Sequence, residues 1–318
     1  MAHNEFAIIR QYFSDIGAPG ANTVLDIGDD AAVVEVPYGY QQVVCMDTLN
    51  AGVHFPLDTD PADIACKALA VNLSDLAAMA AEPDWFQMSL SLPHSEPAWI
   101  EAFAAELRRS AETHGIRLIG GDTCHGELSI TVQVAGLVKA GEFVTRAGAQ
   151  PGDLVLVSGE LGSAGLGLAH LQGRVELPAD LQAHCIERLN RPRPRLELVD
   201  FLRSFATSAI DISDGLQGDL GHILEASGRG ARIDRDSIPV LPWLAQQDLY
   251  EFALGAGDDY EICCTVPPGC RAEIDLWNRK HPNCRLTAIG EIGETGFELR
   301  VGDAIVDLSH ARGYRHFD

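Results

Sequence analysis

The chain has 318 residues, a length that fits two domains or one large one. Apolar residues make up 46% of it and charged residues 22%, which is typical of a soluble globular protein and excludes a disordered one. Lysine and arginine number 23 against 46 acidic residues, for a net charge of −23. Nucleic acid and anionic membrane surfaces are therefore poor partners for this protein.

Two further absences indicate a cytoplasmic protein. No apolar run reaches the roughly 18 residues that a membrane span requires, and the N-terminus lacks the pattern of a secretory signal. The eight cysteines include no C-x-x-C pair, so neither a disulfide framework nor a zinc site is expected.

Strand and helix signals alternate through the first half of the chain. Residues 33–36 and 42–46 are predicted to form two strands joined by a turn at 37–40. A helix is expected to begin at Asp60, which suits an N-cap and is followed by proline, and to end before Pro83. The next predicted elements are a helix over Pro97–His114, ended by Gly115, and strands over 117–119 and 129–138.

A stretch with two glycines and a proline, residues 145–152, is the expected boundary between domains 1–144 and 145–318. Helices are predicted beyond it over Ser163–Leu171, 181–190 and Leu216–Ser227, and strands over 153–157, 208–211, Glu261–Val266 and 286–289. A hairpin is predicted from strands 298–301 and 305–308. The fold class is therefore mixed α/β in two domains.

Many of the acidic residues share one setting, in which a strand or apolar segment is followed by glycine and then aspartate. Strand ends and glycine turns are places where side chains converge on a cleft. Taken singly, each such aspartate is better explained as a turn residue, and Asp214 also as a helix N-cap. The group consists of Asp29, Asp30, Asp47, Asp75, Asp122, Asp211, Asp214, Asp258 and Asp259, with Glu261 nearby.

Asp75 differs from the others because it lies inside a mostly apolar predicted helix. Burying a carboxylate there is unfavourable unless a cation or hydrogen-bond donors meet it. The alternative is an exposed polar stripe formed by Asn72 and Asp75. Because the chain contains only three lysines, the natural compensation for convergent carboxylates is a hard divalent cation such as Mg²⁺.

Familiar nucleotide-binding motifs are missing. No lysine is followed by serine or threonine, which excludes a Walker A motif, and no G-x-G-x-x-G follows a strand. The catalytic-loop and D-F-G signatures of protein kinases are also missing. ATP would therefore bind through metal ions, glycine backbone and a few side chains, with Arg146 as a candidate phosphate clamp and a surface ion pair as its alternative role.

Six segments occur in an order that carries a family resemblance: IGDDAAV, MDTLNAGVHF, KALAVNLSDLAAM, LIGGDT, DISDGL and GDDYE. They resemble the thiamine-monophosphate kinase family, in the superfamily of aminoimidazole ribonucleotide synthetase and selenophosphate synthetase. The resemblance implies an N-terminal α/β domain whose sheets form a barrel across a homodimer. It also implies a C-terminal α/β domain that completes a cleft for ATP.

The resemblance also implies roles for individual residues. Metal-binding positions are matched by Asp30, Asp47, Asp75, Asp122, Asp211 and Asp214. Nucleotide-binding positions are matched by Gly121, Asp122, Arg146 and Ser213. Positions that contact the thiamine moiety are matched by His54, Glu261 and Tyr314. The family often has serine or threonine before Asp47, whereas this chain has Cys45 and Met46, which leaves only their backbone carbonyls as ligands.

Each of the three substrate residues has a plainer explanation. His54 beside Phe55 suits a structural histidine, Glu261 an exposed position at the start of a strand, and Tyr314 simple packing. Cys45 and Met46 likewise suit buried strand positions.

The implied reaction is the phosphorylation of thiamine monophosphate to thiamine diphosphate by ATP. The nucleophile, a phosphate oxygen, is already ionised because the second pKa of a phosphomonoester is about 6, so no general base is needed. We expect direct in-line transfer without a covalent enzyme nucleophile, assisted by several Mg²⁺ ions. The alternatives are a sister ATP-dependent synthetase, a non-catalytic nucleotide- or thiamine-binding module, and a Mg²⁺-dependent phosphatase.

Overall fold

The computed structural model describes residues 5–18 and 20–306. This part of the chain forms two compact units. Unit 1 runs to Leu76 and continues over Ala81–Phe143, whereas unit 2 takes Ala77–Ala80 and the chain from Val144 on. No helix of the described residues is long and apolar enough to cross a membrane.

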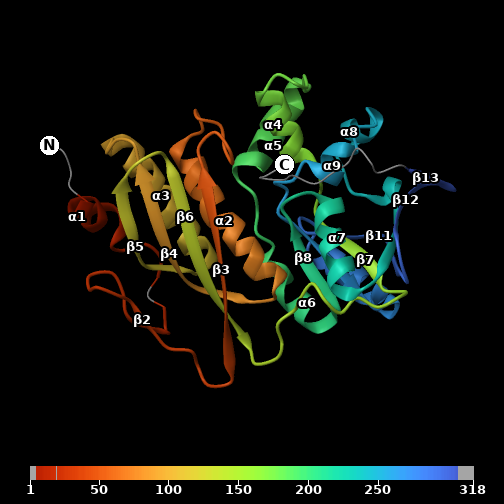
Figure 1. Ribbon diagram of the computed structural model, residues 1–318, viewed down its shortest axis with the longest axis horizontal. Helices are drawn as coiled ribbons and strands as arrows, with labels where there is room; N and C mark the ends of the chain where they lie inside the picture. Colours follow the sequence, from red (N-terminus) through yellow and green to blue (C-terminus); the bar gives the residue numbers. More distant parts are fainter. Residues whose placement is uncertain (1–4, 19, 307–318) are drawn as a thin grey trace. The chain divides into compact units, whose positions relative to one another are not determined.

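Unit 1 contains a four-stranded sheet in the order β3-β6-β4-β5 (Figure 1). Its strands are β3 (Tyr40–Asn50), β4 (Glu82–Leu92), β5 (Arg117–His125) and β6 (Ser129–Lys139). The β4–β5 pair is parallel, and the crossover that a parallel pair requires is helix α3 (Pro97–His114). Helix α2 (Pro61–Ala78) connects β3 to β4. The small elements before β3 are α1 (Glu5–Ile8), a π-helical turn (Ile9–Phe13), β1 (Thr23–Leu25) and β2 (Val33–Val34).

Both long helices of unit 1 begin as their sequences predict. The carboxylate of Asp60 accepts a hydrogen bond of 2.8 Å from the N–H of Ala62, so Asp60 caps α2 and Pro61 occupies its first position. Helix α3 begins at Pro97 and ends at Gly115, which adopts a left-handed conformation with φ 64°.

Unit 2 contains a seven-stranded mixed sheet in the order β13-β12-β9-β11-β7-β10-β8. Its strands are β7 (Leu154–Ser158), β8 (Ser208–Ile212), β9 (Gly230–Asp234), β10 (Glu261–Val266), β11 (Leu286–Gly293), β12 (Phe297–Val301) and β13 (Ala304–Val306). The helices are α4 (Ser163–Leu171), α5 (Ala179–Asn190), α6 (Val199–Phe205), α7 (Leu216–Ser227), α8 (Pro242–Gln246), α9 (Glu251–Gly255) and α10 (Arg271–Lys280). Short 3₁₀ turns cover Leu196–Leu198, Arg235–Ser237 and Pro268–Cys270.

The central strands of unit 2 are buried on both faces. Val155 and Val157 of β7 belong to one apolar core, together with Leu220 of α7. Leu154 and Leu156 alternate with them and belong to a second core, which contains residues of α6 and α10. Burial of each aliphatic side chain of this kind stabilises the folded protein by about 1.5–3 kcal/mol. Strand β7 therefore gives firm support to the loops at its ends.

The structure corrects the predicted hairpin near the start of the chain. The turn exists, with a hydrogen bond of 3.1 Å from the N–H of Tyr40 to the carbonyl of Pro37. However, β2 pairs with β1, whereas β3 pairs along its full length with β6, so the two strands belong to different sheets. Strand β4 was not predicted at all.

In the second half of the chain, the predictions for α4, α7 and β10 agree with the structure in both bounds. The predicted C-terminal hairpin forms between β12 and β13 within the described residues. The mixed α/β class in two parts is confirmed, while the division into domains 1–144 and 145–318 stays a prediction.

Candidate functional site

The sheet of unit 1 separates two of the predicted metal ligands. Asp47 lies on β3 opposite Val132 of β6, and the same row continues through Met88 of β4 to Gly121 of β5, the neighbour of Asp122. Strands β3 and β5 are the two edges of this sheet. Three strand spacings amount to about 14 Å, so Asp47 and Asp122 of one chain would have to hold different ions.

Asn72 joins Asp47 to helix α2, a contact that the sequence did not predict. Its side-chain oxygen accepts a hydrogen bond of 2.9 Å from the N–H of Asp47, and its amide donates to the carbonyl of Ala68 at 3.0 Å. Asn72 is 1% exposed. Asp75, three residues later on the same helix face, is half-buried. The alternative of an exposed polar stripe on α2 is therefore wrong.

Cys45 and Met46 precede Asp47 on β3. Cys45 is half-buried, and its thiol donates a hydrogen bond of 3.4 Å to the carbonyl of Asn72. Met46 points to the opposite face and is 63% exposed, so its interpretation as a buried strand residue is wrong. Metal binding through their carbonyls stays a prediction. Asp30 lies in an exposed bend after β1, where its N–H donates to the carboxylate of Asp29.

His54 lies in the turn that follows β3. Its Nδ1 accepts a hydrogen bond of 3.0 Å from the N–H of Asn50, which places the proton of the neutral imidazole on Nε2. Its carbonyl accepts a hydrogen bond of 3.2 Å from the ammonium of Lys67, which is 2% exposed. Both the imidazole ring and the backbone carbonyl of His54 are therefore held in place by hydrogen bonds.

Unit 2 carries a compact group of acids where β8 ends and α7 begins. Asp211 is the penultimate residue of β8, and Ser213 and Asp214 form the turn that follows. Gly215, not Asp214, occupies the N-cap position of α7, so the N-cap interpretation of Asp214 is wrong.

Asp219, in the first turn of α7, belongs to this group and was not predicted. Its carboxylate accepts a hydrogen bond of 3.0 Å from the N–H of Asp214. Burial raises the pKa of Asp219 to about 8, and the nearby charges of Asp211 and Asp214 contribute to the increase. The three carboxyl groups therefore lie close enough together for their charges to interact.

Glu261, the first residue of β10, is fully buried, so its interpretation as an exposed strand position is wrong. Its carboxylate accepts hydrogen bonds from Arg188 at 2.7 Å, from Arg195 at 2.6 Å and from the hydroxyl of Ser158 at 2.5 Å. Burial alone would raise the pKa of Glu261, but the two arginines outweigh it and hold the pKa below its ordinary value. Arg195 belongs to the RPRPR segment, for which the sequence offered no role.

The predicted nucleotide residues lie on different elements. Gly121 has φ 145°, and a Cβ atom there would collide with the carbonyl of Met88, so only glycine fits. Arg146 is exposed, and its carbonyl accepts a hydrogen bond of 3.3 Å from Ser227 at the end of α7. Tyr314 lies outside the described residues.

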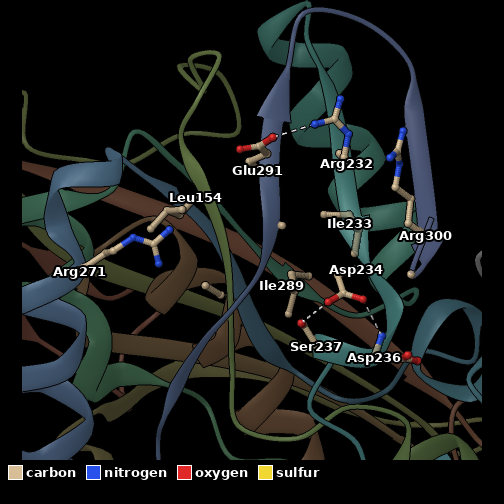
Figure 2. Close-up of a pocket in the computed structure, with 13 residues that line it drawn as sticks. Leu154, Arg232, Ile233, Asp234, Asp236, Ser237, Arg271, Ile289, Glu291 and Arg300 are labelled. Carbon is tan, nitrogen blue, oxygen red and sulfur yellow. Dashed lines mark hydrogen bonds and ion pairs between the residues drawn. The ribbon is translucent and has the colours of Figure 1, made fainter.

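A hollow of about 640 Å³ in unit 2 contains none of the predicted site residues (Figure 2). Several of its polar side chains pair with one another: Arg232 with Glu291 at 2.9 Å, and Ser237 with Asp234 at 2.7 Å. Among the residues that the structure describes, no three His, Cys, Asp or Glu side chains are placed to hold a metal ion by themselves.

Asp259 precedes Glu261 by two residues and is 1% exposed. Its Oδ2 accepts a hydrogen bond of 2.8 Å from the N–H of Gly162, whereas its Oδ1 is buried without a hydrogen-bond partner. Burial raises the pKa of Asp259 to about 8, although the N–H of Gly162 and the charge of Arg188 oppose the increase.

A pH-dependent stability follows for Asp259. Because its pKa is raised in the folded protein, the ionised carboxylate opposes folding, and the resulting loss of stability grows between about pH 4 and pH 8. We expect Asp259→Asn to become more stable relative to the unchanged protein as pH rises through this window, measured by urea unfolding at several pH values. Asp200→Asn, at a side chain that is 88% exposed, is the matched control. A constant difference between Asp259→Asn and the unchanged protein would contradict the expectation.

Known proteins resemble this chain in both of its halves. The family model of AIR synthase related protein, N-terminal domain, matches residues 28–138, and that of the C-terminal domain matches residues 150–302. The thiamine-monophosphate kinase of Escherichia coli strain K12 is 43% identical over 325 residues, which cover 100% of this chain and 99% of that protein. The thiamine-monophosphate kinase of Salmonella typhimurium is 42% identical over 298 residues, which cover 92% of this chain and 88% of that protein.

Solved structures give the same result. The thiamine-monophosphate kinase of Stenotrophomonas maltophilia K279a superimposes with a TM-score of 0.82 at 43% identity, over 88% of this chain and 91% of that one. AaThiL complexed with AMPPCP and TMP superimposes with a TM-score of 0.76 at 32% identity, over 92% of both chains. The hydrogenase maturation protein HypE of E. coli, at 19% identity and a TM-score of 0.76, shares the fold alone.

Proposed function

Since this chain belongs to the thiamine-monophosphate kinase family, we propose that it phosphorylates thiamine monophosphate with ATP and that Mg²⁺ held by its aspartates assists the transfer. The observation that carries the reaction is the 43% identity over the full chain to a thiamine-monophosphate kinase. The AaThiL complex with AMPPCP and TMP, at 32% identity, supports the same pair of substrates.

The donor set of the predicted metal positions supports Mg²⁺. Every side chain in it is a carboxylate, the ligand that hard divalent cations prefer over nitrogen or sulfur. In unit 2 we assign Asp211 and Asp214 to this role, and in unit 1 Asp30, Asp47, Asp75 and Asp122, with the carbonyls of Cys45 and Met46 as further oxygens. When bound, Mg²⁺ neutralises phosphate charge and stabilises the transferring group.

The remaining residues bind and orient the two substrates. We assign the phosphates of ATP to the guanidinium of Arg146 and to the backbone of Gly121. Ser213 joins them as a hydroxyl donor in the turn before α7. The acceptor phosphate needs no proton removed by the enzyme, so positioning is the main task of the chain itself.

The substrate's thiamine moiety is assigned to three residues by family resemblance. The ring of His54 is held in place by a hydrogen bond from the N–H of Asn50 to its Nδ1. Tyr314 supplies an aromatic face. Glu261 is fully buried behind Arg188 and Arg195, so in our proposal its influence on the substrate is indirect.

We further propose that the protein is a cytoplasmic homodimer. Strand β3 is an edge of its sheet, and Val44 and Met46 on its uncovered face are 47% and 63% exposed. An unpaired edge with apolar side chains is unfavourable in water, and a second copy of the chain would cover it. The eight cysteines are all free thiols, which suits a reducing compartment.

A coupled assay of ADP release tests the reaction. We expect ATP turnover to depend on thiamine monophosphate and on Mg²⁺, with thiamine diphosphate as product. Turnover with aminoimidazole precursors instead would indicate a synthetase, binding without turnover a sensing module, and phosphate release without thiamine diphosphate a phosphatase. A covalent phosphoprotein trapped during turnover would exclude the direct transfer.

A further inference from the structure

The loop of residues 257–260, which precedes β10, has an unusual backbone. Gly257, Asp258 and Tyr260 have φ values of 72°, 65° and 49°. Asp258 and Tyr260 carry side chains, for which this left-handed region is unfavourable. Such conformations persist only where the surrounding structure fixes them, and they occur preferentially at functional sites.

The loop lies against the turn that carries Ser213 and Asp214. The N–H of Asp258 donates a hydrogen bond of 2.9 Å to the carbonyl of Ser213, and the N–H of Tyr260 donates one of 2.8 Å to the carbonyl of Ile212. A Cβ atom at Gly257 would collide with the carbonyl of Ser213. The backbone of the loop is therefore packed closely against this turn and hydrogen-bonded to it.

Two arginines, the buried Arg195 and the partly buried Arg188, fix the far end of the loop. Arg195 donates two hydrogen bonds to the carboxylate of Glu261, from Nε to Oε2 at 2.6 Å and from Nη2 to Oε1 at 2.5 Å, which makes a bidentate pair. Arg188 donates to the same carboxylate at 2.7 Å and also to the backbone carbonyl of Asp259 within the loop at 3.3 Å. Arg195 is 6% exposed and Glu261 is fully buried, so water screens this group very little.

We propose that Arg188 and Arg195 are positioning residues: by fixing Glu261 they hold loop 257–260, which in turn places Ser213 and Asp214. The proposal rests on the proposed function, in which Ser213 binds ATP and Asp214 binds Mg²⁺. The proposal also gives a role to the RPRPR segment, whose last arginine is Arg195.

The same segment supplies a matched control. Arg193, two residues before Arg195, is 63% exposed and lies 3.5 Å from Glu187. Replacing either arginine by lysine keeps the charge but removes the planar fork that binds a carboxylate bidentately. Only at Arg195 does that fork hold the loop.

The test compares Arg195→Lys with Arg193→Lys in the full chain by two measurements. The first is amide hydrogen exchange of segments 211–214 and 257–260 without substrate. The second is the Mg²⁺ concentration for half-maximal turnover, separated from the maximal rate. We expect Arg195→Lys to speed exchange in both segments and to raise the half-saturating Mg²⁺ concentration, each about tenfold, whereas Arg193→Lys changes neither.

Two outcomes would overturn the proposal. One is unchanged exchange at 211–214 in Arg195→Lys. The other is a lower melting temperature with unchanged Mg²⁺ dependence, which is what a merely structural ion pair would give. If Arg195→Lys does not fold, Arg188→Lys serves the same comparison. The exchange measurement needs no catalysis, so it tests the proposal even if the unchanged protein fails to phosphorylate thiamine monophosphate.

Discussion

Asp75→Asn is expected to lower the turnover number about a hundredfold or more while leaving the fold intact. Asp75 lies half-buried on α2, three residues beyond Asn72, which binds the backbone of Asp47. The substitution removes a charge that would bind Mg²⁺ but keeps the size of the side chain. Without Mg²⁺ the variant should be as stable as the unchanged protein or slightly more so, because a half-buried carboxylate is no longer desolvated.

Initial rates over a series of Mg²⁺ concentrations, together with thermal unfolding without metal, measure both effects. Asp63→Asn, in the first turn of the same helix, is the control and should keep its Mg²⁺ dependence. Normal kinetics of Asp75→Asn at limiting Mg²⁺ would show that Asp75 is not a ligand.

Glu261→Gln is expected to lower the free energy of unfolding by about 3–5 kcal/mol, the cost of removing one partner from a buried ion pair. The substitution leaves Arg188 and Arg195 facing a neutral amide in a region that water does not reach. Because the glutamine is nearly the same size, lost charge and not lost packing causes the effect.

Urea unfolding at neutral pH measures the loss, and Glu298→Gln, at an exposed pair with Arg300, is the control with a small expected effect. The pKa of Glu261 is lowered in the folded protein, so its stabilisation is complete above its ordinary value of 4.5 and is lost as the pH falls below it. The difference between Glu261→Gln and the unchanged protein should therefore shrink in acid. Equal losses at Glu261 and Glu298 would contradict this account.

Local signals predicted the two long helices of unit 1 well, because caps act within a few residues, whereas α6, α8, α9 and α10 of unit 2 were not predicted. Asp60, Pro97 and Gly115 each mark a helix end in the structure as they do in the sequence. Strand pairing was predicted poorly because the partner of a strand is chosen by distant contacts. The turn at 37–40 suggested a hairpin, yet the partner of β3 is β6, about ninety residues later in the chain.

Strand β4 was missed although its sequence carries a signal. Phe86, Met88 and Leu90 alternate with polar residues and are buried. Pro83 was considered only as the end of the preceding helix, whereas it lies at the second position of this strand, where the backbone pairing is irregular.

The sequence pointed to the acidic residues of the candidate site, but not to the residues that hold those acids in place. Ordered motifs pointed to Asp47, Asp75 and Asp214. The hydrogen bonds that Asn72 and Asp219 make to the backbone of Asp47 and Asp214 depend on how a helix packs against a strand or turn, which the sequence does not show. Arg195 shows the same limit. Its burial depends on a glutamate 66 residues away, and nothing local distinguishes it from the exposed Arg193.

The end of helix α2 belongs to unit 2, which matters for any attempt to produce the two units as separate proteins. Its last residues, Ala77 and Ala78, together with Ala80, pack in the apolar core that contains Leu156 and Phe201, whereas the rest of the helix belongs to the other unit. A gene fragment that begins at Val144 would therefore encode unit 2 without three alanines of its apolar core. Unit 2 is therefore assembled from two separate stretches of the chain, so no single cut in the gene separates it whole from unit 1.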